Sequence, residues 1–156
     1  MSIFPFELDM LFQQATLGVS YHPLADEPDP TQIPFLFFPD RFHFVILPNS
    51  QKKDPFALAK KIAVDHPSVQ AFIFIPGRKF DLAGARQGRG GGWYDRFLSA
   101  IPQNWIRIGI ASQNQLSVTP LKQNSWDVPM HWLIVENKGH WTVHDVAKKT
   151  AIPRSR

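Results

Sequence analysis

The chain has 156 residues, of which 44% are hydrophobic and 19% are charged, so we expect one globular domain over residues 1–156 rather than a disordered chain. It contains no cysteine, which excludes disulfide frameworks and thiolate metal sites. It shows no basic, apolar leader and no run of about eighteen apolar residues, so we expect a cytoplasmic protein that does not span a membrane.

The net charge of +4 is unevenly distributed along the chain. Residues 1–40 form an acidic segment with six acidic residues and no basic residue, whereas the rest of the chain holds all 17 Lys and Arg residues. That basic part would attract an anion such as a phosphate, a nucleotide, a polyglutamate or a nucleic acid. Four lysines are better interpreted as solvated residues around one surface helix: Lys52, Lys53, Lys60 and Lys61.

The beginning of the chain is weakly patterned. Residues 6–17 favour a short helix, and residues 22–34 are typical of a proline-rich, acidic loop. Residues 35–48 contain two short apolar runs divided by a Pro-Asp pair, which predicts two strands or a strand and an edge piece.

A clearer helix follows at residues 55–66. Asp54 and Pro55 are typical of an N-cap and a first helical position. The apolar spacing along this segment predicts a core face with these members: Phe56, Ala59, Ile62 and Ala63.

The second half alternates between strand and helix patterns. Residues 69–77 are almost purely apolar and predict a strand buried on both faces, as in the centre of a parallel sheet. A helix is expected over residues 94–103 and two further buried strands over 105–112 and 130–137. The remaining segments are a short ambiguous stretch, a small terminal element and a frayed tail, at residues 115–121, 140–150 and 150–156. The alternation predicts a layered α/β domain.

The stretch "ARQGRGGGWYDRFL", residues 85–98, lies between a predicted strand and a predicted helix. Ligands bind at such a strand end in open α/β sheets, and glycines let backbone N–H groups approach an anion at the mouth of a helix. Arg86 and Arg89 add donors suited to phosphate oxygens. The carboxylate of Asp95 would repel phosphates unless a divalent cation lies between them, which indicates a magnesium–nucleotide site.

This glycine stretch matches neither the Walker A pattern nor the dinucleotide-binding pattern in its usual place. The alternative interpretation is a flexible turn, with Asp95 a favourable charge in the first turn of a helix. Both interpretations stay open on local chemistry alone.

Residues 72–98 resemble the signature of the 5-formyltetrahydrofolate cyclo-ligase family, also called 5,10-methenyltetrahydrofolate synthetase. The signature runs from an apolar strand through Pro-Gly and Phe-Asp to a glycine-rich stretch and Tyr-Asp. The matching pieces are Pro76-Gly77, Phe80-Asp81, Gly84-Ala85-Arg86, Gly88-Arg89-Gly90-Gly91-Gly92 and Trp93-Tyr94-Asp95. Two later blocks, residues 106–116 and 126–136, are similar to the family's next strands at the expected distance. The resemblance covers about residues 70–137.

The resemblance implies a three-layer α/β/α sandwich with a mostly parallel central sheet (NagB/RpiA/CoA transferase-like). It also implies an enzyme that uses ATP and Mg²⁺ to convert 5-formyltetrahydrofolate into 5,10-methenyltetrahydrofolate. In that reaction the formyl oxygen is phosphorylated, the N10 amine attacks the activated carbon, and phosphate leaves. The expected partners are a reduced folate and ATP, with no nucleic acid and no membrane.

The residue roles carried by the resemblance are these. The nucleotide-binding positions are Arg86, Gly88, Arg89, Gly90, Gly91, Gly92, Trp93 and Tyr94. The positions that face the folate are Arg89, Gly90, Gly91, Gly92 and Trp93. The metal-associated acids are Asp95 and Asp127, and the catalytic residues are Arg89 and Asp95.

The chain also departs from the family pattern. Family members begin with a basic helix that reaches the nucleotide phosphates, whereas here the first basic residue is Arg41. Trp93, Trp126 and His131 stand where the family has Tyr, His and Asp. Two other functions therefore stay open beside the active ligase. One is a non-catalytic paralogue that binds a nucleotide or folate, and the other is a nucleic-acid-binding module, suggested by the basic region and "GRGGGWYDR".

Overall fold

The computed structural model describes residues 3–34, 43–48, 52–67 and 70–146. Its central feature is a six-stranded sheet with the strand order β2-β1-β3-β6-β7-β8. The strands are β1 (Leu17–Tyr21), β2 (His43–Leu47), β3 (Ala71–Ile75), β6 (Ile106–Ser112), β7 (Trp132–Asn137) and β8 (His140–Asp145). The first five pair in parallel, and β8 is antiparallel to β7. A mixed α/β fold with a mostly parallel sheet was predicted, and the structure confirms it.

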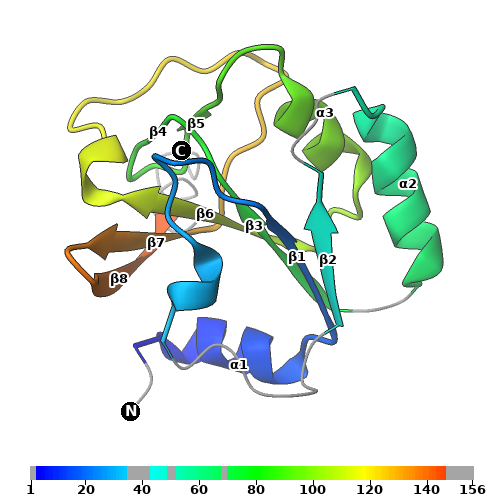
Figure 1. Ribbon diagram of the computed structural model, residues 1–156, viewed down its shortest axis with the longest axis horizontal. Coiled ribbons are helices and arrows are strands. Elements are labelled where there is room, and N and C mark those ends of the chain that lie inside the picture. Colours follow the sequence, from blue (N-terminus) through cyan, green and yellow to red (C-terminus); the bar gives the residue numbers. More distant parts are fainter. Residues whose placement is uncertain (1–2, 35–42, 49–51, 68–69, 147–156) are drawn as a thin grey trace, which may run out of the picture.

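Helices cover both faces of this sheet (Figure 1). Helix α1 (Phe6–Gln14) lies on one face, and α2 (Pro55–Asp65) and α3 (Trp93–Ala100) lie together on the other. Short elements complete the fold: a hairpin of β4 (Lys79–Phe80) and β5 (Arg86–Gln87), and the 3-10 helices η1 (Pro30–Gln32) and η2 (Gln113–Gln115).

The alternation of side chains along β3 explains why the sheet is buried on both faces. Phe72 and Phe74 pack into the core beneath α1, where the rings of Phe12 and Phe72 lie edge to face with their centroids 4.9 Å apart. Ile73 and Ile75 point the other way, into the core beneath α2 and α3. All five residues of β3 are buried, so the sequence prediction of a doubly buried strand is confirmed.

The helix start at Asp54 is also confirmed. One carboxylate oxygen of Asp54 accepts hydrogen bonds from the N–H groups of Phe56 and Ala57, at 3.0 and 3.5 Å, and so satisfies two donors that the first turn leaves free. Ala59 and Ile62 are buried as predicted, but the assignment of Phe56 to the core face was wrong. Phe56 is 49% exposed because it lies in the first turn of α2, at the edge of the helix–sheet contact.

The sequence analysis missed β1, which lies between β2 and β3 near the middle of the sheet. Residues 140–145, predicted only as a small terminal element, form the edge strand β8. The first of the two strands expected within residues 35–48 and the tail at 150–156 lie outside the described residues. In the described ranges, no helix is long and apolar enough to cross a membrane.

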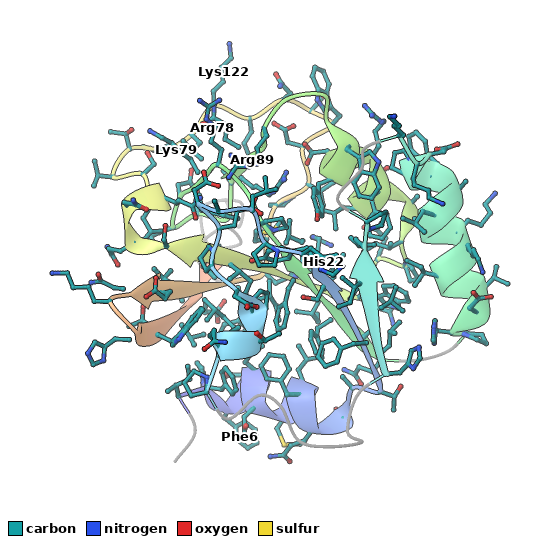
Figure 2. The ribbon with its side chains drawn as sticks, in the orientation of Figure 1. Phe6, His22, Arg78, Lys79, Arg89 and Lys122 are labelled. Atoms are coloured by element: carbon teal, nitrogen blue, oxygen red, sulfur yellow. The ribbon has the colours of Figure 1, made fainter. Side chains whose placement is uncertain are left out.

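Parallel pairing brings the carboxyl ends of β1, β2, β3, β6 and β7 to one edge of the sheet. The loops that leave β1 and β3 and the long connection between η2 and β7 meet at this edge, beside the start of α3. Four basic side chains lie toward this end of the molecule in Figure 2, opposite α1: Arg78, Lys79, Arg89 and Lys122.

Candidate functional site

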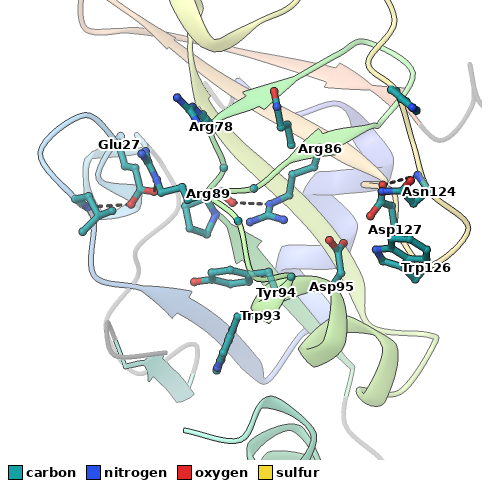
Figure 3. Close-up of a pocket in the computed structure, with 18 of the residues that line it drawn as sticks. Glu27, Arg78, Arg86, Arg89, Trp93, Tyr94, Asp95, Asn124, Trp126 and Asp127 are labelled. Carbon is teal, nitrogen blue, oxygen red and sulfur yellow. Dashed lines mark hydrogen bonds and ion pairs between the residues drawn. The ribbon is translucent and has the colours of Figure 1, made fainter. Parts of the chain in front are cut away.

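A cleft of about 640 Å³ opens at the carboxyl edge of the sheet (Figure 3). Its walls come from the loop after β1, the Pro76–Arg78 turn after β3, the glycine stretch up to the start of α3, and residues 122–127. Every site residue expected from the sequence lines this cleft except Gly91, which lines an adjoining hollow together with Asp95 and Asp127. The fold therefore brings the candidate residues together.

The glycine stretch ends in three successive residues with positive φ. Gly90, Gly91 and Gly92 have φ values of 101°, 77° and 65°, which only glycine adopts without strain. Gly92 is the N-cap of α3, and no side chain caps this helix end. The first N–H groups of α3 are thus presented next to the cleft, in an arrangement suited to an anion.

Arg86 lies buried in the cleft wall. Its Nε donates a 2.7 Å hydrogen bond to the carbonyl of Pro76, and its guanidinium lies 5.0 Å from the centre of the Tyr94 ring. Burial lowers the pKa of Arg86, whereas the nearby charge of Asp95 opposes that shift. The side chain is thus held in place by the framework, with its positive charge directed toward the two acids of the cleft.

Those acids are Asp95, in the first turn of α3, and Asp127, in the loop before β7. An oxygen of Asp95 accepts from the N–H of Val128 at 3.2 Å, and an oxygen of Asp127 accepts from the N–H of Asn124 at 2.7 Å. Burial raises the pKa of Asp95 and the nearby charge of Asp127 raises it further, whereas the N–H of Val128 and the charge of Arg86 oppose the shift. Two carboxylates from distant segments therefore face the same cleft.

Such a pair fits a divalent cation. The donors are carboxylate oxygens, which Mg²⁺ prefers, and Mg²⁺ takes one or two carboxylates beside substrate phosphates and water. Within the described residues, no group of three or more His, Asp or Glu side chains could hold a metal ion. The pair therefore fits magnesium shared with a phosphate ligand better than a cage made of protein ligands alone.

Arg89 is engaged by the acidic segment before residue 40. Its Nη2 donates to both carboxylate oxygens of Asp26, at 2.9 and 3.0 Å, and its Nε donates to Glu27 at 3.1 Å. Glu27 also accepts the N–H of Leu24 at 2.9 Å. The acidic loop after β1 is thus fastened to the glycine stretch across 62 residues of sequence.

Trp93 is a core residue that reaches the cleft only at its edge. It is 4% exposed, its ring stacks on Phe97 with centroids 5.4 Å apart, and its Nε1 donates to the carbonyl of Lys53 at 2.9 Å. Tyr94 is half-buried and its pKa is raised by burial. The indole of Trp93 therefore fixes α3 to the segment before α2, and the face it stacks on Phe97 is closed to a ligand.

Two buried polar side chains hold the rim of the cleft. Asp81 accepts the N–H groups of Ala83 and Ala85 with one oxygen and that of Leu121 with the other, at 2.9, 2.9 and 2.8 Å. Gln115 donates a 3.0 Å hydrogen bond to the carbonyl of Gly77. These bonds connect the β4–β5 hairpin and the turn after β3 to the loop that carries Lys122.

The cleft also contains residues that sequence reasoning did not assign to it. Among them are His22, Leu24, Glu27, Arg78, Lys122 and Asn124. Lys122 had no predicted position, and the structure places it on the rim. Glu27 was part of a segment interpreted only as an acidic loop, and the charge contrast between residues 1–40 and the glycine stretch was the one available signal that the two would meet.

Comparison with known proteins extends the match seen in the sequence. The 5-formyltetrahydrofolate cyclo-ligase family model matches residues 31–136. A 5-formyltetrahydrofolate cyclo-ligase from Haemophilus influenzae is 43% identical over 68 residues, which cover 40% of this chain and 34% of that protein. The chain thus matches about a third of the length of this curated relative.

Two solved structures share the fold. The 5,10-methenyltetrahydrofolate synthetase of Aquifex aeolicus superimposes with a TM-score of 0.57 and 22% identity, over 87% of this chain and 74% of that one. The synthetase of Mycoplasma pneumoniae gives a TM-score of 0.50 and 18% identity, over 81% and 82% of the two chains. Because the family model spans well over half of the sequence, this chain belongs to the 5-formyltetrahydrofolate cyclo-ligase family.

Proposed function

We propose that the chain catalyses the ATP- and Mg²⁺-dependent cyclisation of 5-formyltetrahydrofolate to 5,10-methenyltetrahydrofolate. Family membership supports the reaction class. The observation that carries the proposal is the pairing of Asp95 and Asp127 beside the positive-φ glycines, inside one cleft with Arg86. That combination provides a cation site and an anion site next to each other.

The glycine stretch and α3 receive the phosphates in this proposal. Backbone N–H groups at Gly90, Gly91 and Gly92 and at the start of the helix are fixed donors for phosphate oxygens. Arg86 faces the same space from a buried position, where a charge acts more strongly than in water. The close approach of Gly88 to the Arg86 guanidinium supports a nucleotide-binding role for Gly88, because a Cβ there would lie 3.2 Å from an Arg86 nitrogen.

Asp95 and Asp127 would hold the magnesium ion, whose chemistry is to neutralise charge on the transferred phosphoryl group. The reaction transfers the γ-phosphoryl group to the formyl oxygen, after which N10 attacks the formyl carbon and phosphate leaves. The residues of this chain contribute position and charge rather than covalent chemistry. Both acids are anchored, because the N–H of Val128 holds one oxygen of Asp95 and the N–H of Asn124 holds one oxygen of Asp127.

The folate is expected on the side of the cleft where the glycine stretch meets the loop after β1. Glu27 and Arg89 form this wall, together with His22 and Leu24. The predicted catalytic role of Arg89 depends on its remaining nitrogen, Nη1, which has no hydrogen-bond partner among the described residues, since Nε and Nη2 are taken by Glu27 and Asp26. Trp93 contributes to this wall by fixing α3.

The test is the appearance of the methenyl product's near-ultraviolet absorbance when purified protein is mixed with 5-formyltetrahydrofolate, ATP and Mg²⁺. We expect absorbance to grow only with all three present. Asp95→Asn should lower the rate about 100-fold, because the metal site loses a charged ligand. Asp65→Asn is the matched control, since this exposed acid on α2 does not line the cleft and pairs with Lys61 at 2.9 Å.

Each outcome is informative. An increase in product absorbance that needs no ATP, or that Asp95→Asn leaves unchanged, would contradict the proposed site. A flat trace from protein that still binds ATP or folate by calorimetry would show the non-catalytic nucleotide- or folate-binding alternative to be correct. A flat trace without any binding would refute both.

A further inference from the structure

An ion pair beside the cleft joins Arg89, which lines the cleft, to Asp26, which lines an adjoining hollow. Both carboxylate oxygens of Asp26 accept hydrogen bonds from one nitrogen of the guanidinium, at 2.9 and 3.0 Å. A carboxylate in this position shows where arginine can hold two oxygens of an anion. Asp26 comes from the loop after β1, so the anion in this place belongs to the protein itself.

A second arginine acts on the same carboxylate. Arg78 lines the same wall of the cleft, above Arg89 in Figure 3. The hydrogen bond from Arg89 lowers the pKa of Asp26, and the positive charges of Arg89 and Arg78 lower it further. Among the described residues Arg78 has no ion-pair partner of its own. The guanidinium of Arg89 therefore binds Asp26 directly, and Arg78 adds a second positive charge on the same wall of the cleft.

The two arginines are held independently of Asp26. The N–H of Arg78 donates to the carbonyl of Gln87 at 2.7 Å, and Gln115 fixes the preceding carbonyl of Gly77. Arg89 is held through its Nε by Glu27, whose side chain is only 5% exposed. The backbone of Arg78 and the guanidinium of Arg89 are therefore held by contacts that do not involve Asp26.

Asp26 is well suited to be exchanged. Its side chain is 65% exposed, in contrast to that of its neighbour Glu27. An exposed ion pair of this kind contributes little to stability, because water and salt screen the two charges. An incoming carboxylate or phosphate can replace Asp26 at small cost, whereas the same group cannot replace Glu27 without burying an unpaired charge.

We propose that Arg78 and Arg89 form an oxyanion subsite, which the carboxylate of Asp26 fills in the free protein and from which a carboxylate or phosphate group of the bound ligand displaces it. This inference rests on the proposed function, because it concerns the same cleft. The displacing group is either the glutamate carboxylate of the folate or a phosphate of the nucleotide, and the two share the two-oxygen geometry that an arginine recognises.

The experiment is isothermal titration calorimetry on the full chain, comparing the wild type with Asp26→Asn, Arg78→Gln and Asp9→Asn. The last is the matched control, because Asp9 is an acid on α1, on the opposite side of the molecule from the cleft, whose side chain accepts from Gln13. The probes are 5-formyltetrahydrofolate and its pteroate counterpart without the glutamate, and ATP and adenosine. Asp26→Asn removes the competing anion, so it should tighten binding about two- to fivefold. Arg78→Gln should weaken the binding of the same ligand by a similar factor.

The pattern of gains identifies the source of the anion. If Asp26→Asn raises the affinity for the folate but not for the pteroate, the subsite binds the glutamate carboxylate. If it raises the affinity for ATP but not for adenosine, the subsite binds a phosphate. The inference is overturned if Asp26→Asn changes neither ligand's affinity, if it weakens binding, or if Asp9→Asn gives the same gain. Absence of binding of both ligands by the wild type overturns the proposed function as well, which distinguishes the two failures.

Discussion

Asp81 should be among the acids whose removal costs the most stability, although it touches no ligand in the proposed site. It is 4% exposed and accepts three backbone N–H groups: those of Ala83, Ala85 and Leu121. These bonds close the β4–β5 hairpin and hold the 113–127 loop against it. Asp81→Ala would leave all three donors without their acceptor.

The magnitude follows from where the three donors lie. Ala83 is exposed, so water can replace its bond and the loss there is small. Ala85 is buried and Leu121 is half-buried, and each bond to a carboxylate contributes about 1.5–2 kcal/mol. Asp81→Ala should therefore lower the free energy of unfolding by about 3–4 kcal/mol. Asp81→Asn keeps one oxygen for the hairpin and should cost about half as much.

The assay is urea unfolding followed by tryptophan fluorescence, with five tryptophans as probes. Asp54→Ala is the matched control, because Asp54 also accepts two backbone N–H groups but is exposed, and N-cap removal of this kind costs about 1 kcal/mol. A loss for Asp81→Ala no greater than that for Asp54→Ala would refute the reasoning that burial makes these bonds strong.

Three further outcomes are expected. The neutral ring of His131 accepts a hydrogen bond from the N–H of Arg107, and burial together with the charge of Arg107 lowers the pKa of His131 from 6.5 to about 4. As the pH falls, the unfolded chain therefore takes up this proton before the folded chain does, so the free energy of unfolding should be full above pH 6.5 and fall by about 2 kcal/mol between pH 6.5 and 4. Urea titrations at several pH values should show this slope, and His131→Asn should flatten it. Gly109→Ala should cost about 3 kcal/mol in the same assay, because the added Cβ would lie 2.6 Å from the ring of Phe80, and a loss below 1 kcal/mol would contradict this. Gly92→Ala has room for its methyl group, so it should lower the free energy of unfolding only by the roughly 1–2 kcal/mol that a positive φ costs a residue with a Cβ. A larger loss of thermal stability would contradict this.

Much of the fold follows from local signals. The Asp54-Pro55 pair predicted the start of α2 to the residue, and the apolar runs predicted β3, β6 and β7 because strands buried on both faces carry few polar residues. The strand β1 escaped prediction because it is only five residues long and includes a glycine and a serine. Gly18 is there because the rings of Phe44 and Phe72 occupy the space of a side chain, a contact between segments that no local pattern reveals.

The residues of the candidate site likewise fall into those that the sequence predicts and those that it does not. Residues within one local segment, such as the glycines and Asp95, could be predicted because their chemistry and spacing are visible together. The partners of Arg86 and Arg89 could not, since Pro76 and Asp26 lie 10 and 63 residues away. Two arginines three residues apart look equivalent in sequence, yet one is buried in the wall and the other is paired with the acidic loop.

The different positions of these two arginines bear on how the cleft would recognise a polyanion. Arg86 is fixed by Pro76 and Tyr94, so its charge needs no rearrangement when a ligand arrives. Arg89 is already neutralised, so any anion that uses it must first compete with Asp26. No described side chain caps the first N–H groups of α3, so these donors are open to a ligand. Fixed dipoles and a buried charge favour the geometry of one ligand, whereas loose surface cations would attract any anion. If Asp26 competes with the ligand as we propose, the acidic loop after β1 would add selectivity to a basic cleft, by opposing anions that cannot also bind Arg78 and the glycine stretch.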